Sequence, residues 1–110
     1  MNTDGLQAVR DEGELEAALA HPLVVLYKHS PLCGMSAIAA VEVRKFAEED
    51  AAAPVYVLDV LRQRALARSV ERRFGIRHES PQVIVLRDGV PVWNASHRGV
   101  TAAGIRAAVG

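Results

Sequence analysis

The chain contains very little cysteine: Cys33 is the only one among its 110 residues. A single cysteine cannot form an internal disulfide, so the sequence is not that of a disulfide-stapled secreted scaffold, and we expect a reducing compartment. Any disulfide that the protein forms must include a second molecule. The four histidines are not spaced with Cys33 as a set of metal ligands, so we expect no bound metal.

Net charge, aromatic residues and long apolar runs are also lacking. The 13 basic residues balance the 13 acidic ones, and aromatic residues make up 5% of the chain. Because the charges balance, the protein has no large electrostatic potential of one sign that would attract nucleic acid or a membrane surface, and we expect neither partner. No apolar run approaches the roughly 20 residues that cross a bilayer, and the first residues lack the apolar core of a secretory signal. We therefore expect a cytoplasmic protein.

Length and apolar content predict a single domain that spans residues 1–110. Half of the residues are hydrophobic, and a chain of this length buries roughly two thirds of its unfolded surface around one core. We expect a monomer, and a dimer joined through Cys33 is the alternative.

Apolar runs predict five strands. The expected strands are residues 6–9, 22–28, 55–60, 83–86 and 90–95. The run at 22–28 is apolar almost throughout, which is typical of a central strand buried on both faces. Asp88 and Gly89 separate the last two strands and suit a type I′ turn, so these strands should form a hairpin.

Helical periodicity and capping residues predict four helices. Asp11 and Glu14 have the spacing of a capping box that opens the first helix. The second runs from 35 to about 48, with Val43 and Phe46 on its apolar face. The third has Leu66 on its core face, and a fourth begins after Thr101. The order βαβ, α, ββ, α is that of the α/β thioredoxin-like fold, with a central mixed β-sheet flanked by helices.

Cys33 lies between the predicted central strand and the start of the second helix. A thiol attacks as the thiolate, and the free N–H groups and partial positive charge of a helix start favour that anion. We expect Ser36 to donate a hydrogen bond to the sulfur, and Lys28 or His29 to add positive charge. The alternative is that Cys33 is a small buried hydrophobe, the usual state of a lone free cysteine.

Ser80 and Pro81 precede the strand at 83–86. Thioredoxin-like folds place a cis-proline there, beside the reactive sulfur, and an ordinary proline at a strand start is the alternative. His29 and His78 flank the two loops that should meet at the sulfur. They are candidates for tuning its charge, and solvated loop histidines are the alternative.

Three other features carry a structural interpretation. We expect His21 at a helix end and Trp93 in the core. We also expect a solvated helix face, rather than a phosphate site, from the arginines at 62, 64, 68 and 72.

Three stretches, "YKHSPLCGMSA", "FGIRHESPQ" and "NASHRGVTA", resemble the monothiol bacilliredoxins of the bacilliredoxin C type, which are thioredoxin-fold proteins of bacteria that use bacillithiol. The resemblance runs from about Leu6 to the C-terminus. It implies that Cys33 is the nucleophile, that Ser36 occupies the place of a resolving cysteine, and that Pro81 is the cis-proline. The chain departs from the family pattern at Gly34-Met35, where Pro-Ile is usual, and at Arg98, where an aromatic residue is common.

The resemblance implies a thiol-disulfide oxidoreductase that removes bacillithiol from S-bacillithiolated client proteins. Bacillithiol would be the thiol co-substrate, and no bound cofactor is expected. Two alternatives stay open. "CGMS" is one residue from the "CGFS" of monothiol glutaredoxins, which hold an iron-sulfur cluster between two protomers, although no second glycine pair precedes the last helix. The other alternative is a non-catalytic thioredoxin-like binding module.

Overall fold

The computed structural model describes residues 6–49 and 53–110, and a five-stranded sheet forms its middle layer. The sheet has the order β1-β3-β2-β4-β5 and consists of β1 (Gln7–Ala8), β2 (Leu23–His29), β3 (Val55–Asp59), β4 (Gln82–Arg87) and β5 (Val90–Ser96). β1, β3 and β2 are parallel, whereas β4 and β5 are antiparallel to their neighbours. The strand predicted at 22–28 is central, and the mixed sheet confirms the predicted α/β class.

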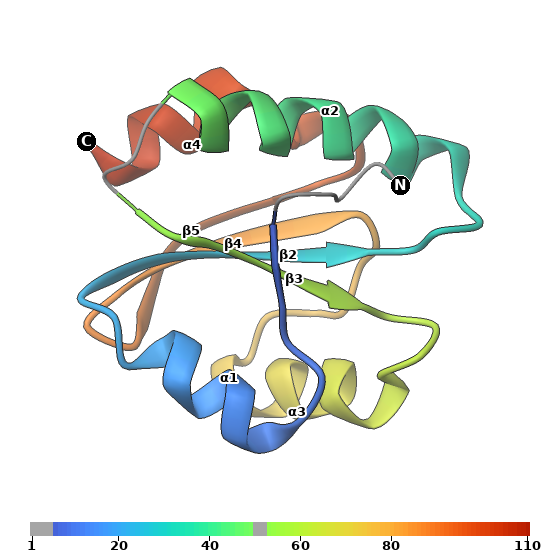
Figure 1. The fold of residues 1–110 in the computed structure, drawn as a ribbon, viewed down its shortest axis with the longest axis vertical. Helices are drawn as coiled ribbons and strands as arrows, with labels where there is room; N and C mark the ends of the chain where they lie inside the picture. The colour runs from blue at the N-terminus through green and yellow to red at the C-terminus, as the bar shows by residue number, and fades with distance from the viewer. Residues whose placement is uncertain (1–5, 50–52) are drawn as a thin grey trace.

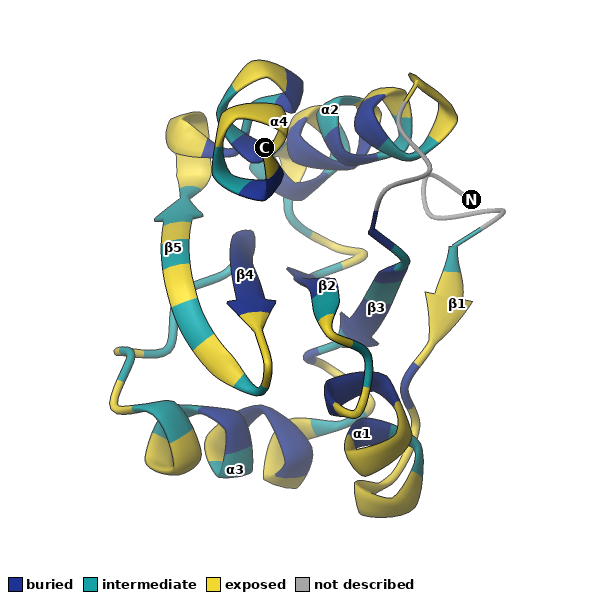
Figure 2. Cartoon of the chain, turned by 90° about the vertical axis from the view of Figure 1, so that its left-hand side faces the viewer, coloured by how far each residue is buried: buried dark blue, intermediate teal, exposed yellow. Residues whose placement is uncertain are grey.

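Helices cover both faces of the sheet (Figure 1). The helices are α1 (Glu12–Leu19), α2 (Gly34–Glu49), α3 (Arg64–Phe74) and α4 (Ala102–Val109), with a 3-10 turn, η1 (His97–Gly99), before α4. α2 and α4 form one layer, and α1 and α3 form the other (Figures 1 and 2). Among the described residues, no helix is long and apolar enough to cross a membrane.

The predicted start of the first helix is confirmed, with one difference in its capping box. The Asp11 carboxylate accepts the N–H of Glu14 at 2.8 Å. The Glu14 carboxylate, however, accepts the N–H of Arg10 at 2.8 Å rather than that of Asp11. It also binds the Arg10 guanidinium. The second hydrogen bond of the capping box is therefore made to the residue before Asp11.

The predicted turn and the later helix ends are confirmed as well. Asp88 and Gly89 have φ angles of 53° and 78°, as a type I′ turn requires. Gly75 ends α3 with φ 65°, in the left-handed region that glycine enters without steric cost. The Thr101 hydroxyl accepts the N–H of Gly104 at 3.0 Å and caps α4.

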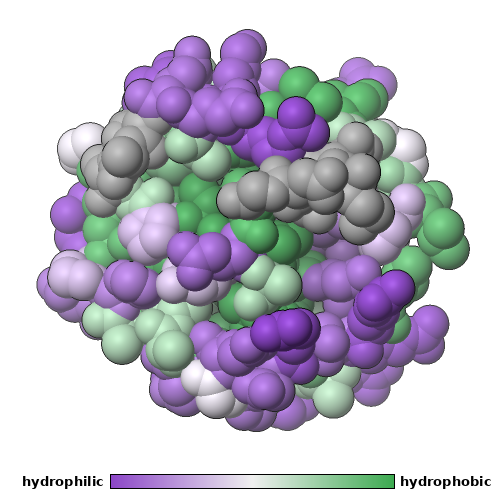
Figure 3. All heavy atoms as spheres, viewed as in Figure 1, coloured by the Kyte–Doolittle hydropathy of each residue, from purple (hydrophilic) through white to green (hydrophobic). Residues whose placement is uncertain are grey.

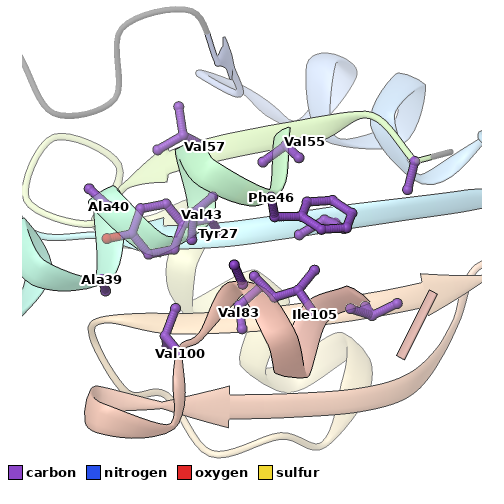
Figure 4. Close-up of a cluster of buried hydrophobic side chains, with 14 of the residues drawn as sticks. Tyr27, Ala39, Ala40, Val43, Phe46, Val55, Val57, Val83, Val100 and Ile105 are labelled. Carbon is purple, nitrogen blue, oxygen red and sulfur yellow. The ribbon is translucent and has the colours of Figure 1, made fainter. Parts of the chain in front are cut away.

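Two apolar clusters fill the spaces between the layers. The cluster between the sheet and the layer of α2 and α4 contains Tyr27, Phe46 and Ile105, which converge in Figure 4. Trp93 is partly buried against it. The other cluster, between the sheet and the layer of α1 and α3, contains Leu15 and Leu26. Alternate residues of β2 enter the two clusters, which explains why its sequence is apolar on both faces.

Polar side chains cover the outer sides of the helices. In Figure 3 they gather over the upper and lower helical layers, with hydrophobic surface between them. The four arginines at 62, 64, 68 and 72 are exposed, as predicted. His21 lies just beyond α1, as expected, and its Nε2 is 2.9 Å from the hydroxyl of Tyr56.

We predict that Phe46→Ala lowers the free energy of unfolding by about 3–5 kcal/mol, because Phe46 is fully buried and its loss leaves a cavity. Urea unfolding followed by circular dichroism measures the change. Ile38→Ala is the matched control, since Ile38 lies on the same helix and is 69% exposed. Equal losses for the two variants would contradict the assignment of the core face of α2.

Candidate functional site

Cys33 lies at the turn that joins β2 to α2. Its own N–H donates to the carbonyl of Ser30 at 3.1 Å, and its carbonyl accepts the N–H of Ser36 at 3.0 Å. The thiol is half-buried. The chain therefore turns tightly after the central strand and leaves Cys33 directly before the first residue of α2, as the sequence predicts.

Backbone N–H groups surround the sulfur and stabilise its anion. The N–H of Ser36 is the strongest influence that lowers the pKa of the Cys33 thiol, and the N–H of Met35 is the next. The Ser36 hydroxyl lowers this pKa further, while desolvation opposes the shift. The start of α2 thus lowers the pKa of Cys33 even though Gly34 and Met35 replace the family's Pro-Ile.

Ser36 is buried and uses its hydroxyl in two ways. Its oxygen accepts the N–H of Ser30 at 3.2 Å, which ties the loop before Cys33 to α2. The hydroxyl proton is then available to the sulfur of Cys33. Ser36 therefore fixes the loop and favours the thiolate from one position.

Tyr27 joins the site from β2, and its sequence signal was only that of a residue in an apolar strand. Its hydroxyl donates to the carbonyl of Ser36 at 3.0 Å and lies 2.9 Å from Nδ1 of His29. Figure 4 shows the phenol oxygen on the side of α2, near Ala39 and Ala40. Because the single hydroxyl proton goes to Ser36, Nδ1 of His29 must be the donor in the other bond.

His29 is buried next to this hydroxyl and stays neutral. Desolvation lowers the pKa of His29, and the nearby carboxylate of Asp59 opposes that shift only in part. The prediction that His29 adds positive charge to the sulfur is therefore wrong. Its position at the end of β2 makes it a hydrogen-bonding partner of Tyr27 instead.

Lys28 points to the other face of the sheet, because successive residues of a strand alternate between faces. Its side chain is fully buried, and its Nζ donates to Oε1 of Gln82 at 2.9 Å. Desolvation lowers the pKa of Lys28 to about 8, against the carboxylates of Glu71 and Glu79. Lys28 is not among the groups that shift the pKa of Cys33. The prediction that Lys28 adds positive charge near the sulfur is therefore also wrong.

Pro81 lies across from the end of β2. The Ser80–Pro81 peptide bond is cis. Lys28 pairs with Gln82 in the sheet, so Pro81 is placed opposite His29, next to the loop that leads to Cys33. The carbonyl of Pro81 accepts the N–H of His97 at 2.9 Å, which brings η1 to the same edge.

His97 was not predicted as a site residue, although it belongs to the "ASH" motif of the resemblance. Its Nε2 lies 3.7 Å from the carboxylate of Glu79, on the loop that carries Pro81. This contact and the backbone bond to Pro81 hold η1 against the loop.

His78 and Ser80 lie on the same loop and keep unused polar atoms. The backbone N–H of His78 donates to the Glu71 carboxylate at 2.7 Å. Burial, followed by the charge of Lys28, lowers the pKa of His78, so it is neutral and does not supply the predicted charge. Nδ1 of His78 and Oγ of Ser80 are buried and have no hydrogen-bond partner within the described part of the chain.

Two clefts open at this edge of the sheet. One, of about 220 Å³, is bordered by Arg10, His29, Asp59 and Arg62. The other, of about 280 Å³, lies between the start of α3 and His78. Within residues 6–49 and 53–110, no three histidine, cysteine or acidic side chains are grouped to hold a metal ion.

Comparison with known proteins gives one family match and many structural ones. The family model described as monothiol bacilliredoxin BrxC matches residues 5–105. A solved protein proposed to be an oxidoreductase with a thioredoxin fold is 26% identical, and the match covers 100% of this chain and 99% of that chain with a TM-score of 0.91.

Thioredoxins are similar at lower identity. A mutant thioredoxin from Halobacterium salinarum NRC-1 is 22% identical, with 97% of this chain and 89% of that chain covered and a TM-score of 0.77. Mitochondrial thioredoxin 3 from Saccharomyces cerevisiae is 12% identical, with 99% and 97% covered and a TM-score of 0.80. These likenesses confirm the predicted thioredoxin-like fold.

We predict that Ser36→Ala raises the pKa of Cys33, because the sulfur loses the hydroxyl that lowers it. Alkylation by iodoacetamide at about pH 6 should slow several-fold, whereas the rate well above the thiol pKa should not change. The pH profile of the alkylation rate measures both. Ser69→Ala, on α3, is the matched control, and a Ser36→Ala profile identical to wild type would contradict the role of the hydroxyl.

Burial of Lys28 predicts a pH-dependent stability. Since the pKa is about 8 in the folded protein and 10.5 in the unfolded chain, the unfolded chain binds more protons between these values. The free energy of unfolding should therefore rise with pH across this window, by up to about 1.4 kcal/mol per pH unit. In urea unfolding, Lys28→Met should lose this rise and Lys45→Met should keep it. Parallel pH curves for wild type and Lys28→Met would contradict the assignment.

Proposed function

This chain belongs to the monothiol bacilliredoxin BrxC family, and from that membership we propose that it removes bacillithiol from S-bacillithiolated client proteins in the cytoplasm. The observation that carries the proposal is the position of Cys33. Its sulfur lies against the N–H groups of Ser36 and Met35, and these lower its pKa, so that a larger fraction is thiolate at neutral pH.

The first step is a thiol-disulfide exchange. The Cys33 thiolate attacks the bacillithiol sulfur of the mixed disulfide, the bond between that sulfur and the client sulfur breaks, and the client leaves as a thiolate that takes a proton from water. Cys33 is then joined to bacillithiol by a disulfide. One disulfide is broken and one is formed, so this step needs no further oxidant or reductant.

The second step needs a diffusible thiol, because Ser36 has no sulfur with which to resolve the adduct. A bacillithiol thiolate attacks the adduct, and the products are bacillithiol disulfide and the Cys33 thiolate. Each client thiol released therefore consumes one free bacillithiol, and the bacillithiol taken from the client leaves together with it as the disulfide. One copy of the chain is enough for both steps.

Ser80 and Pro81 are proposed to align the client. The exchange needs three sulfurs roughly in line, and groups that hold the client chain at a fixed angle favour that geometry. The pairing of Lys28 with Gln82 supports this role, since it puts Pro81 beside the loop of Cys33. Tyr27 is a positioning residue that holds the first turn of α2 through Ser36.

We predict that wild-type protein mixed with a bacillithiolated client releases about one client thiol per Cys33 without added thiol, and turns over when bacillithiol is present. A thiol-reactive dye measures the client thiol, and mass spectrometry identifies the adduct on Cys33. Cys33→Ser should release none. Equal release by wild type and Cys33→Ser would overturn the proposed function.

A further inference from the structure

The larger cleft at the edge of the sheet has an unusual set of charges. It lies between the start of α3 and the loop before Pro81, and it is bordered by Val60, Leu61, Arg64, Ala67, Arg68 and His78. We call it the α3 cleft. Its volume of about 280 Å³ is just below the usual range for small-molecule sites and is enough for part of a small molecule.

The α3 cleft lies at the same edge of the sheet as the turn that carries Cys33. The N–H of Val60 donates to the carbonyl of His29 at 2.9 Å, so one wall of the cleft begins at the end of β2. His78, on the other wall, is two residues before Ser80 and Pro81. The starts of α2 and α3 are at the same edge of the sheet, above and below it (Figure 1). A molecule joined to Cys33 can therefore extend past Pro81 toward the cleft.

Two cations on the cleft have no ion-pair partner. Within the described residues, no carboxylate forms an ion pair with Arg64 or Arg68. Two acids lie near the loop of His78. The carboxylate of Glu71 accepts the N–H of His78, and the charge of Arg68 helps to lower its pKa, while Glu79 lies 3.6 Å from Arg77. An anion in the cleft would therefore not have to displace a carboxylate bound directly to Arg64 or Arg68.

Two buried polar atoms on the adjoining loop support the same conclusion. Nδ1 of His78 and Oγ of Ser80 lack hydrogen-bond partners in the described part of the protein. Leaving a buried polar atom unpaired costs about 1–3 kcal/mol, so each such atom calls for a partner, and a bound water, ion or ligand can provide it. Both lie on the segment that links the cleft to Pro81.

The smaller cleft beside His29 has no arginine without an ion pair. Its arginines are paired, because Arg10 binds the carboxylate of Glu14 at 2.9 Å and Arg62 lies 3.9 Å from that of Asp59. An anion there would have to compete with these carboxylates.

We propose that the α3 cleft binds the anionic end of the small thiol while Cys33 attacks its sulfur, with Arg64 and Arg68 pairing with the anion and His78 donating a hydrogen bond. This inference rests on the proposed function and adds the part of the substrate that is recognised. The group that the cleft would bind is an oxyanion carried by a low-molecular-weight thiol, and two such thiols are considered. Bacillithiol provides it as the two carboxylates of its malyl group, and coenzyme A provides it as phosphates.

The α3 cleft binds the substrate during the first thiol-disulfide exchange. The small thiol, still bonded to the client, places its anion against Arg64 and Arg68, and its sulfur is then held near Cys33. The new disulfide joins this sulfur to Cys33, and the client sulfur leaves as a thiolate. Binding energy from an end of the substrate that does not react orients the bond that breaks.

The test uses one client peptide in three mixed disulfides: with bacillithiol, with cysteinyl-glucosamine, which lacks the malyl group, and with coenzyme A. Single-turnover release of the peptide thiol is measured without any added thiol. We expect wild type to prefer the bacillithiol form over the truncated form by about tenfold, the size of effect expected from charge-assisted hydrogen bonds. The Arg64→Gln/Arg68→Gln double variant should lose this preference.

Arg72→Gln is the matched control, since Arg72 lies on the same exposed row of α3 but not on the cleft. It should keep the preference. If the arginine-dependent preference is for the coenzyme A form instead, the cleft is an anion site and the anion is a phosphate. Equal release from all forms by wild type and the double variant would overturn the inference while leaving the proposed function intact. No release from any form would overturn the proposed function itself.

Discussion

The negative charge on the sulfur of Cys33 is the constraint on which the rest of the site depends. A thiolate at neutral pH needs hydrogen-bond donors, and here the N–H groups of Ser36 and Met35 supply them. These groups are fixed only if the first turn of α2 is fixed. Tyr27 binds the carbonyl of Ser36, and Ser30 binds its hydroxyl, so β2 and the loop both hold that turn in place.

Backbone groups, rather than cationic side chains, stabilise the thiolate. His29 and Lys28 are each next to the loop of Cys33 in sequence, but burial disfavours the charged form of His29, and Lys28 points to the other face of the sheet, where it binds Gln82. The N–H groups of a helix start carry their partial charge without any titration. The stabilisation of the sulfur should therefore vary little with pH over the range in which His29 titrates.

The sequence predicts the fold better than it predicts the site. The apolar runs locate the central strand and the hairpin, and Asp11, Gly75 and Thr101 locate helix ends, because these signals are local. Lys28 was misjudged because its partner, Gln82, is 54 residues away along the chain. The bond from Tyr27 to Ser36 also depends on packing of β2 against α2, which no short motif encodes.

The absence of a second sulfur changes what must be recognised. A site with two cysteines expels its substrate by forming an internal disulfide, so the partner needs to be held only briefly. Ser36 can donate a hydrogen bond to the thiolate but cannot attack a disulfide, so the adduct on Cys33 lasts until a diffusible thiol arrives. Selectivity for one small thiol then has to come from contacts away from the sulfur, because every thiol presents the same reacting atom. Among the described residues, Arg64 and Arg68 on α3 are cations without an ion pair, and they border a cleft at the edge of the sheet where β2 ends.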